Sequence, residues 1–198
     1  MNSRNHILIG TVVYEYIKEK YGVVLDQHSF LKGNTCPDHG VSFLRPHRVR
    51  YCSKMLQRKT KRLCNSGFKI VGSRASKRFG ILCHYYSDFF CCAHTPQFEG
   101  NLKAHVRYEN ELLHFMEENY SFFREIDYIG DHSFAESAEE INERMRGLIR
   151  EKKISQTDYA MELICAIQTC AELVLSIYLT VLSPLEAVAG RLVSRGIA

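Results

Sequence analysis

The sequence predicts an all-α protein that folds as a single domain over residues 1–198. Apolar residues recur at helical spacing along most of the chain, and no segment alternates apolar and polar residues as a half-buried strand does. A chain of 198 residues, 45% of them hydrophobic, can bury one core but is short for two. Without repeats or low-complexity runs, we expect one helical bundle.

The first third of the chain is expected to form two helices and a loop. Apolar residues on one face predict a first helix, with His6 in its first turn, that ends near Gly22. A short helix is expected at about residues 26–32. The glycines, asparagine and proline of GNTCPDHG, residues 33–40, predict a loop that carries Asp38.

Further helices are expected along the rest of the chain. A basic helix should begin near His47, a second should contain HYYSDFFCCAH and end at Thr95 and Pro96, and a third should cover residues 102–119. An irregular stretch is expected at residues 128–132, followed by three helical segments. Among these, LVLSIYLTVLSPL is too short to span a bilayer, which favours a buried core helix.

Charge is divided unevenly along the chain. Residues 1–80 hold 16 Lys and Arg and 4 Asp and Glu, whereas residues 81–198 hold 10 and 18. Residues 47–65 contain no acid, so their helix either pairs with the acidic second half or offers a surface to phosphate-bearing partners, including an anionic membrane surface. The opening residues lack the pattern of a signal peptide, which predicts a cytoplasmic protein with reduced cysteines.

Two histidine and carboxylate pairs are spaced four residues apart, His84 with Asp88 and His105 with Glu109. On a helix such residues lie on the same face, so each pair can bind one cation. His94 lies between the pairs, where the chain turns from one helix toward the next. Imidazole nitrogen and carboxylate oxygen are ligands of Zn²⁺, which takes three or four of them. The alternative is a set of buried polar groups hydrogen-bonded to one another.

Three further residues of ligand type precede these five in the sequence, and the order of all eight carries a family resemblance. The full order is His6, Asp38, His47, His84, Asp88, His94, His105 and Glu109. It resembles the zinc-dependent phospholipase C family, which shares its helical fold with single-strand-specific zinc nucleases, and the resemblance covers residues 6–109.

The resemblance implies a cluster of two or three zinc ions. One zinc would be held by Asp38, His47, His84 and Asp88, a second by His94, His105 and Glu109, and a third by His6 with Asp88 as a bridge. Secreted members use the amine and carbonyl of an N-terminal tryptophan as further ligands of the third zinc. This chain contains no Trp and starts at Met1. Either water completes that shell or the site holds two metals.

The resemblance also implies the reaction. Zinc ions would activate water to hydrolyse a phosphodiester, with Asp38 as metal ligand and general base, and the substrate would be a phospholipid headgroup or a small phosphodiester. A nuclease or nucleotidase is the alternative enzyme, although nucleic acid is the less favoured partner. A non-catalytic binding module stabilised by zinc is the alternative outside enzymes.

Overall fold

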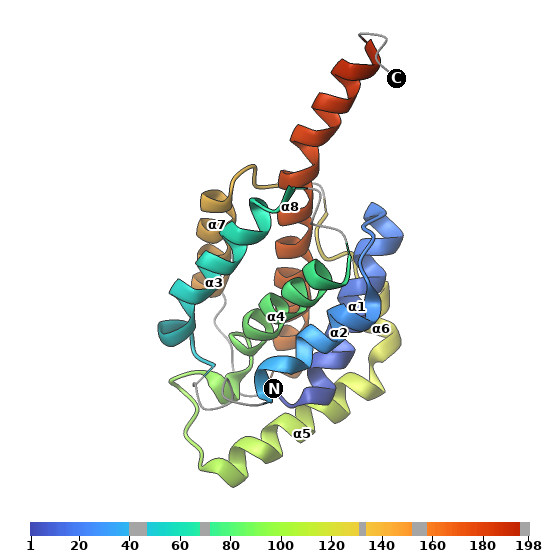
Figure 1. The fold of residues 1–198 in the computed structure, drawn as a ribbon. Helices are drawn as coiled ribbons and strands as arrows, with labels where there is room; N and C mark the ends of the chain where they lie inside the picture. Colours follow the sequence, from blue (N-terminus) through green and yellow to red (C-terminus); the bar gives the residue numbers. More distant parts are fainter. Residues whose placement is uncertain (40–46, 68–71, 131–133, 152–157, 195–198) are drawn as a thin grey trace.

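A computed structural model describes residues 1–39, 47–67, 72–130, 134–151 and 158–194, with side chains as far as residue 182. Every regular element in these residues is a helix, so the predicted all-α class is confirmed. The ribbon shows a bundle from which the last turns of the C-terminal helix extend (Figure 1).

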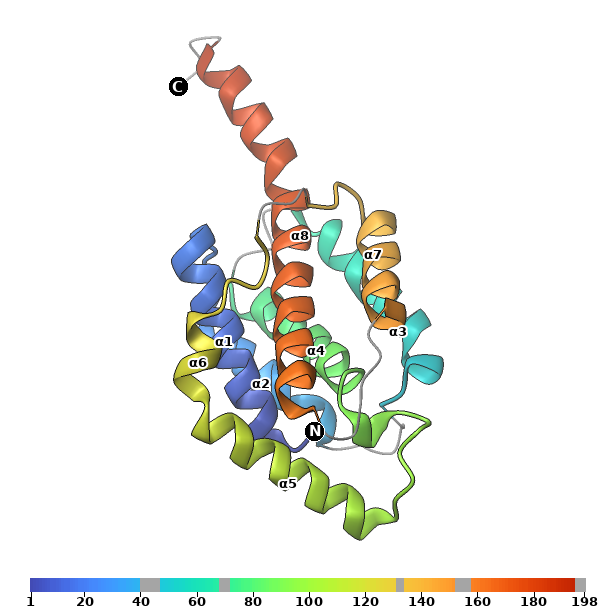
Figure 2. The same cartoon turned by 180° about the vertical axis from the view of Figure 1, so that it is seen from behind.

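The C-terminal helix, α8 (Tyr159–Ser194), is the centre of the bundle. The other helices lie around its first half when the molecule is seen from either side (Figure 2). Its residues 159–182 are long and apolar enough to cross a membrane, but 72% of the most apolar window is buried inside the protein. The expected core helix therefore exists, and it begins earlier in the chain than the quoted run. Two helices, rather than the three expected, form after residue 133 in the described part of the chain.

The first helix, α1 (Ser3–Tyr21), forms where the sequence predicts it. The Asn2 side chain accepts a hydrogen bond from the Asn5 amide and caps the start. Gly22 ends the helix with a φ of 65°, and its amide donates to the carbonyls of Ile17 and Lys18. The cap at Asn2 fixes the start of the helix, so His6 lies at the end of the first turn, on the buried face.

The next helix, α2 (Gln27–Thr35), extends three residues beyond its expected end. Residues 33–35 were expected in a loop, and a short 3-10 turn, η1 (Cys36–Asp38), follows them instead. Gly33 packs against Gly80 of α4 (Ser73–Asp88) so closely that an added Cβ would lie 2.2 Å from the Lys77 carbonyl oxygen. Contact between the helices thus outweighs the weak helix propensity of glycine.

The helix α4 ends at Asp88, so the expected end after His94 was wrong. Residues 89–93 are all buried, at 7% exposure or less. A continuous apolar run cannot be buried on one face of a helix, so the chain leaves the helix and forms the 3-10 turn η4 (Cys92–His94).

The remaining helices complete the wall of the bundle. The basic helix is α3 (Val49–Cys64), which begins two residues after His47 and lies beside α7 (Ala138–Glu151). Lys61 and Glu139 form an ion pair of 3.1 Å between these two helices. The helix α5 (Leu102–Glu118) is followed by the short α6 (Tyr120–Glu125), which was not expected as a separate element.

Candidate metal centre

The pair His84 and Asp88 lies on the buried face of α4. Both side chains are almost fully buried, and His84 Nε2 is 3.4 Å from Asp88 Oδ2. The i, i+4 spacing places both groups on one side of the helix, as the sequence predicted. A continuous apolar core surrounds that side of α4, so neither group is paired with bulk water.

A backbone carbonyl orients the His84 ring. Its Nδ1 lies 2.7 Å from the carbonyl oxygen of Asn34, the residue that follows Gly33 in the tight α2–α4 contact. Because a carbonyl can only accept, Nδ1 carries the proton and Nε2 has a free lone pair. That lone pair lies among the cluster atoms, 3.4 Å from Asp38 Oδ1 and 3.1 Å from His47 Nδ1.

A serine orients His6 in the same way. The Ser87 hydroxyl donates to the His84 carbonyl oxygen at 2.9 Å, and it lies 3.1 Å from His6 Nδ1. Since its single proton is already donated, the hydroxyl must accept from His6 Nδ1. The unprotonated Nε2 of His6 is buried 3.3 Å from Asp88 Oδ1, and it has no hydrogen-bond partner in the described residues.

His47 and Asp38 contribute to the same group of ligands from positions outside the α-helices. His47 lies just before α3, and its Nδ1 is 2.8 Å from Asp88 Oδ2 and 3.8 Å from Asp38 Oδ1. Asp38 ends η1 and keeps 20% of its side chain exposed. It is therefore the carboxylate of this group that solvent can reach.

A second group is formed by η4 and α5. Glu109 Oε1 lies 3.0 Å from His94 Nε2 and 2.9 Å from His105 Nε2. His105 and Glu109 are one helical turn apart on α5, again as the sequence predicted. The side chains are 14% exposed for His94, 29% for His105 and 12% for Glu109.

The terminal ammonium of Met1 lies between the two groups. It donates to Asp88 Oδ1 at 2.6 Å, and it lies 3.0 Å from Glu109 Oε1 and 2.8 Å from His94 Nε2. Burial opposes its charge, yet Asp88 and Glu109 raise the pKa of this amine to about 12. A cation thus already contacts three of the predicted ligand atoms.

Two carboxylates of the centre, Asp88 and Glu109, favour their charged form and the buried imidazole its neutral form, whereas burial raises the pKa of Asp38. Burial raises the pKa of Asp88, but His94, the Met1 ammonium and His6 outweigh it and hold this pKa well below its usual range. Burial lowers the pKa of His84 well below its usual range. Ionised carboxylates beside neutral imidazoles are the protonation states that a metal requires.

The donor set fits zinc. Three groups of ligand atoms each lie within 4.8 Å of one another: His6 with His84 and Asp88, Asp38 with His47 and His84, and His94 with His105 and Glu109. All donors are imidazole nitrogens or carboxylate oxygens, which are zinc ligands. The buried and unpartnered Nε2 of His6 beside a carboxylate is the arrangement that a cation would stabilise.

The structure brings together all eight residues that the sequence singled out. That they bind metal stays a prediction, and so does the number of ions. Sequence reasoning missed the supporting Ser87 hydroxyl and Asn34 carbonyl. Ser87 offered one signal, because it lies three residues after His84 and so shares its helix face; the Asn34 carbonyl offered none.

The remaining histidines differ in their surroundings. His39 is exposed and lines the cavity above the centre, whereas His114 is 73% exposed and pairs with Glu118 on the outside of α5. His132 lies outside the described residues.

The cavity above the centre holds about 550 Å³ and is lined by Asp38, His47, His94, His105 and Glu109, among others, so a substrate can reach the centre.

The chain matches a known protein family. A model of the zinc dependent phospholipase C family matches residues 5–155, which include all eight predicted ligands. This confirms the resemblance and extends it from residue 109 into the region of α7. No curated protein and no solved structure matches the chain.

Proposed function

The chain belongs to the zinc-dependent phospholipase C family, and we propose that it hydrolyses a phosphodiester in a phospholipid, between the diacylglycerol oxygen and the headgroup phosphorus. The observation that supports this most is the cluster of five histidines and three carboxylates, of which His47, His94, His105, Asp38 and Glu109 line one solvent-accessible cavity. Zinc ions bound there would lower the pKa of a bound water and neutralise the oxygens of a phosphodiester.

The protein side chains would divide the remaining work. Asp38 is the more exposed of the two carboxylates on the cavity wall, at 20% against 12% for Glu109, so it is the group placed to accept the proton of an attacking water. Asp88 is buried and contacts His6, His47 and His84, so its role is to hold the ligands together. The open mouth of the cavity leaves room for the rest of a substrate.

The proposal also includes where the enzyme works. The exposed side of α3 carries Arg50, Lys54 and Arg58, and none of them pairs with a carboxylate among the described residues. Such a face is attracted to anionic phosphate, which favours peripheral contact with an anionic membrane surface. For a cytoplasmic enzyme the substrate would be an inner-leaflet lipid or a small soluble phosphodiester.

One experiment tests the metal centre and the reaction together. Zinc content and diacylglycerol release from phospholipid vesicles would be measured for the purified protein and for His84→Ala and Glu109→Ala. We expect two or three zinc ions per chain, fewer in both variants, and loss of activity in parallel. His114→Ala is the matched control, because it removes an exposed imidazole from α5.

The alternatives give different results in the same experiment. The basic face of α3 also suits a nucleic-acid backbone, so cleavage of single-stranded DNA or RNA without diacylglycerol release would favour a nuclease. Full zinc occupancy without turnover of any phosphodiester would favour a zinc-stabilised binding module. Less than one zinc per chain, unchanged in the variants, would contradict all three.

A further inference from the structure

A second cavity adjoins the metal centre. It holds about 790 Å³ and lies between the start of α3, the segment that follows α4, and the end of α7. Arg48 and His94 line both this cavity and the one above the predicted metal ligands. A molecule bound at the centre through its phosphate can therefore extend into the second cavity.

The lining of the second cavity is strongly positive. Arg48 and Arg50 line it from the start of α3, and Arg150 lines it from the end of α7. No Asp or Glu is among its lining residues, and none of these arginines forms an ion pair with a carboxylate in the described part of the chain. Guanidinium groups bind phosphate through two parallel hydrogen bonds, so three of them without a counter-charge favour a phosphate group.

The direction of α3 adds to this positive potential. The helix starts at Val49, its first turn contains no acid, and Arg48 makes no side-chain cap. The N-terminus of a helix carries partial positive charge and usually attracts carboxylates, yet here arginines surround it. Arg48 and Arg50 carry like charges on either side of Val49 in the sequence, and a bound anion would offset both.

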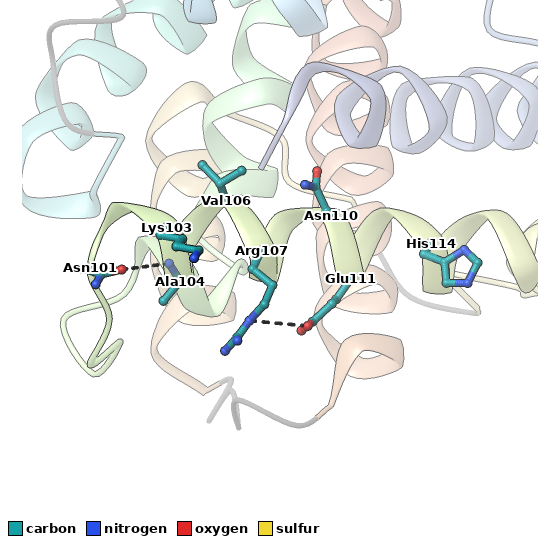
Figure 3. Close-up of a pocket in the computed structure, with 8 residues that line it drawn as sticks. All are labelled: Asn101, Lys103, Ala104, Val106, Arg107, Asn110, Glu111 and His114. Carbon is teal, nitrogen blue, oxygen red and sulfur yellow. Dashed lines mark hydrogen bonds and ion pairs between the residues drawn. The ribbon is translucent and has the colours of Figure 1, made fainter.

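A third hollow in the molecule has a largely compensated surface charge. It has a similar size, about 780 Å³, and it is lined by α5 and its N-cap residue Asn101. Its Arg107 lies 3.6 Å from Glu111 and forms an ion pair, so Lys103 is the single basic side chain left to attract an anion, against three arginines in the second cavity (Figure 3). The second cavity and the third hollow therefore do not differ in size. They differ in uncompensated positive charge, which in the second cavity lies next to the metal centre.

We infer that the second cavity is an anion subsite and that the preferred substrate carries a second phosphate group, a phosphomonoester, on its headgroup. This inference rests on the proposed function, because the metal centre must hold the scissile phosphodiester. Phe89 and Ile149 line the same cavity and would contact the carbon skeleton that joins the two phosphates. Either a lipid headgroup or a soluble phosphodiester can supply this chemistry.

The test compares two matched substrates. One is a short-chain phospholipid with a phosphorylated polyol headgroup, and the other has the same headgroup without the phosphomonoester. For each, kcat/KM and zinc content would be measured with the natural chain, Arg50→Gln/Arg150→Gln and Arg58→Gln. Arg58 is exposed on the same helix but does not line the cavity, so it controls for a general loss of positive charge.

We expect the natural chain to prefer the phosphorylated substrate by about tenfold or more, since a charge-assisted hydrogen bond contributes about that factor. The double variant should lose most of this preference with unchanged zinc content, and Arg58→Gln should keep it. The same comparison with deacylated glycerol phosphodiesters separates the two sources, because a preference seen in both forms places recognition in the headgroup alone.

Other outcomes overturn the inference in distinguishable ways. Turnover of both lipids at equal rates, or a preference that survives in the double variant, removes the subsite and leaves the proposed function intact. A zinc-loaded protein that hydrolyses neither lipid removes the proposed function itself. Cleavage of single-stranded oligonucleotides that depends on Arg50 and Arg150, with no effect on the lipid pair, assigns the cavity to a nucleic-acid backbone.

Discussion

The two halves of the candidate metal centre are built differently. In the half around α4, His6, His84 and Asp88 have side-chain exposures of 0 to 1%, and Asp38, on the cavity wall, has 20%. In the half formed by η4 and α5, His105 has an exposure of 29%. Exposure to water weakens electrostatic attraction and allows ligands to exchange, so the first half should hold a metal more firmly than the second.

The difference extends to the groups behind the ligands. In the first half, the Asn34 carbonyl and the Ser87 hydroxyl fix which nitrogen of each ring is protonated. In the second half, the polar contacts that the His94 and His105 rings make among the described residues go to groups of the centre itself. Supporting hydrogen bonds orient metal ligands before the metal arrives, so the first half is the preorganised one.

Replacing the buried carboxylate should have the largest effect. Asp88→Asn removes the charge that contacts His6, His47 and the Met1 ammonium, and we expect the free energy of unfolding to fall by about 3–5 kcal/mol, with loss of most bound zinc. Glu109→Gln, in the more exposed half, should cost clearly less. Urea unfolding and zinc content measure both, and equal losses in the two variants would contradict the comparison.

A pH dependence should come from Glu162, which lies behind the exposed half and accepts a hydrogen bond from Tyr108. Burial raises the pKa of its carboxyl to about 7 from 4.5, although the Tyr108 hydroxyl acts in the other direction. The unfolded chain therefore ionises first as the pH rises, and stability is lost between pH 4.5 and pH 7. The full loss is about 3 kcal/mol by linkage.

Glu162→Gln tests this by removing the ionisation. The variant should be more stable than the natural chain at pH 8, and the difference should shrink toward pH 5. Thermal unfolding across this range measures it, with the exposed Glu111→Gln as control. A difference that does not change with pH would mean that the Glu162 carboxyl does not titrate there.

The supporting hydroxyl should have a smaller effect. Ser87→Ala removes the acceptor that orients His6, and we expect zinc affinity to fall by about tenfold to a hundredfold. Thr95→Ala is the matched change in the exposed half, where the hydroxyl donates to the Cys92 carbonyl and contacts no predicted ligand. Competition with a zinc chelator measures both, and a larger effect from Thr95→Ala would reverse the comparison.

The smallest expected difference between the two halves is in the rate at which they lose zinc. A chelator should remove zinc in two phases, the faster from the half with His105, with rates that differ by about tenfold if the supporting hydrogen bonds set the difference. His105→Ala should eliminate the fast phase alone. A single phase in the natural chain would show that the ions leave as one unit.

The sequence by itself determined what depends on neighbouring residues. The 3.6-residue period placed His84 beside Asp88 and His105 beside Glu109, and the cap at Gly22 ended α1 where expected. The order of ligand types was enough to suggest the family, which the family match then confirmed. These features follow from local geometry, which is the same in any helix.

Only the tertiary structure decided what depends on distant contacts. The Asn34 carbonyl contacts His84 because Gly33 and Gly80 let two helices approach closely. Ser87 contacts His6, which lies 81 residues earlier in the sequence. The arginines at the start of α3 and the end of α7 share a cavity for the same reason. Such contacts depend on how whole helices pack, and no local pattern records which faces will meet.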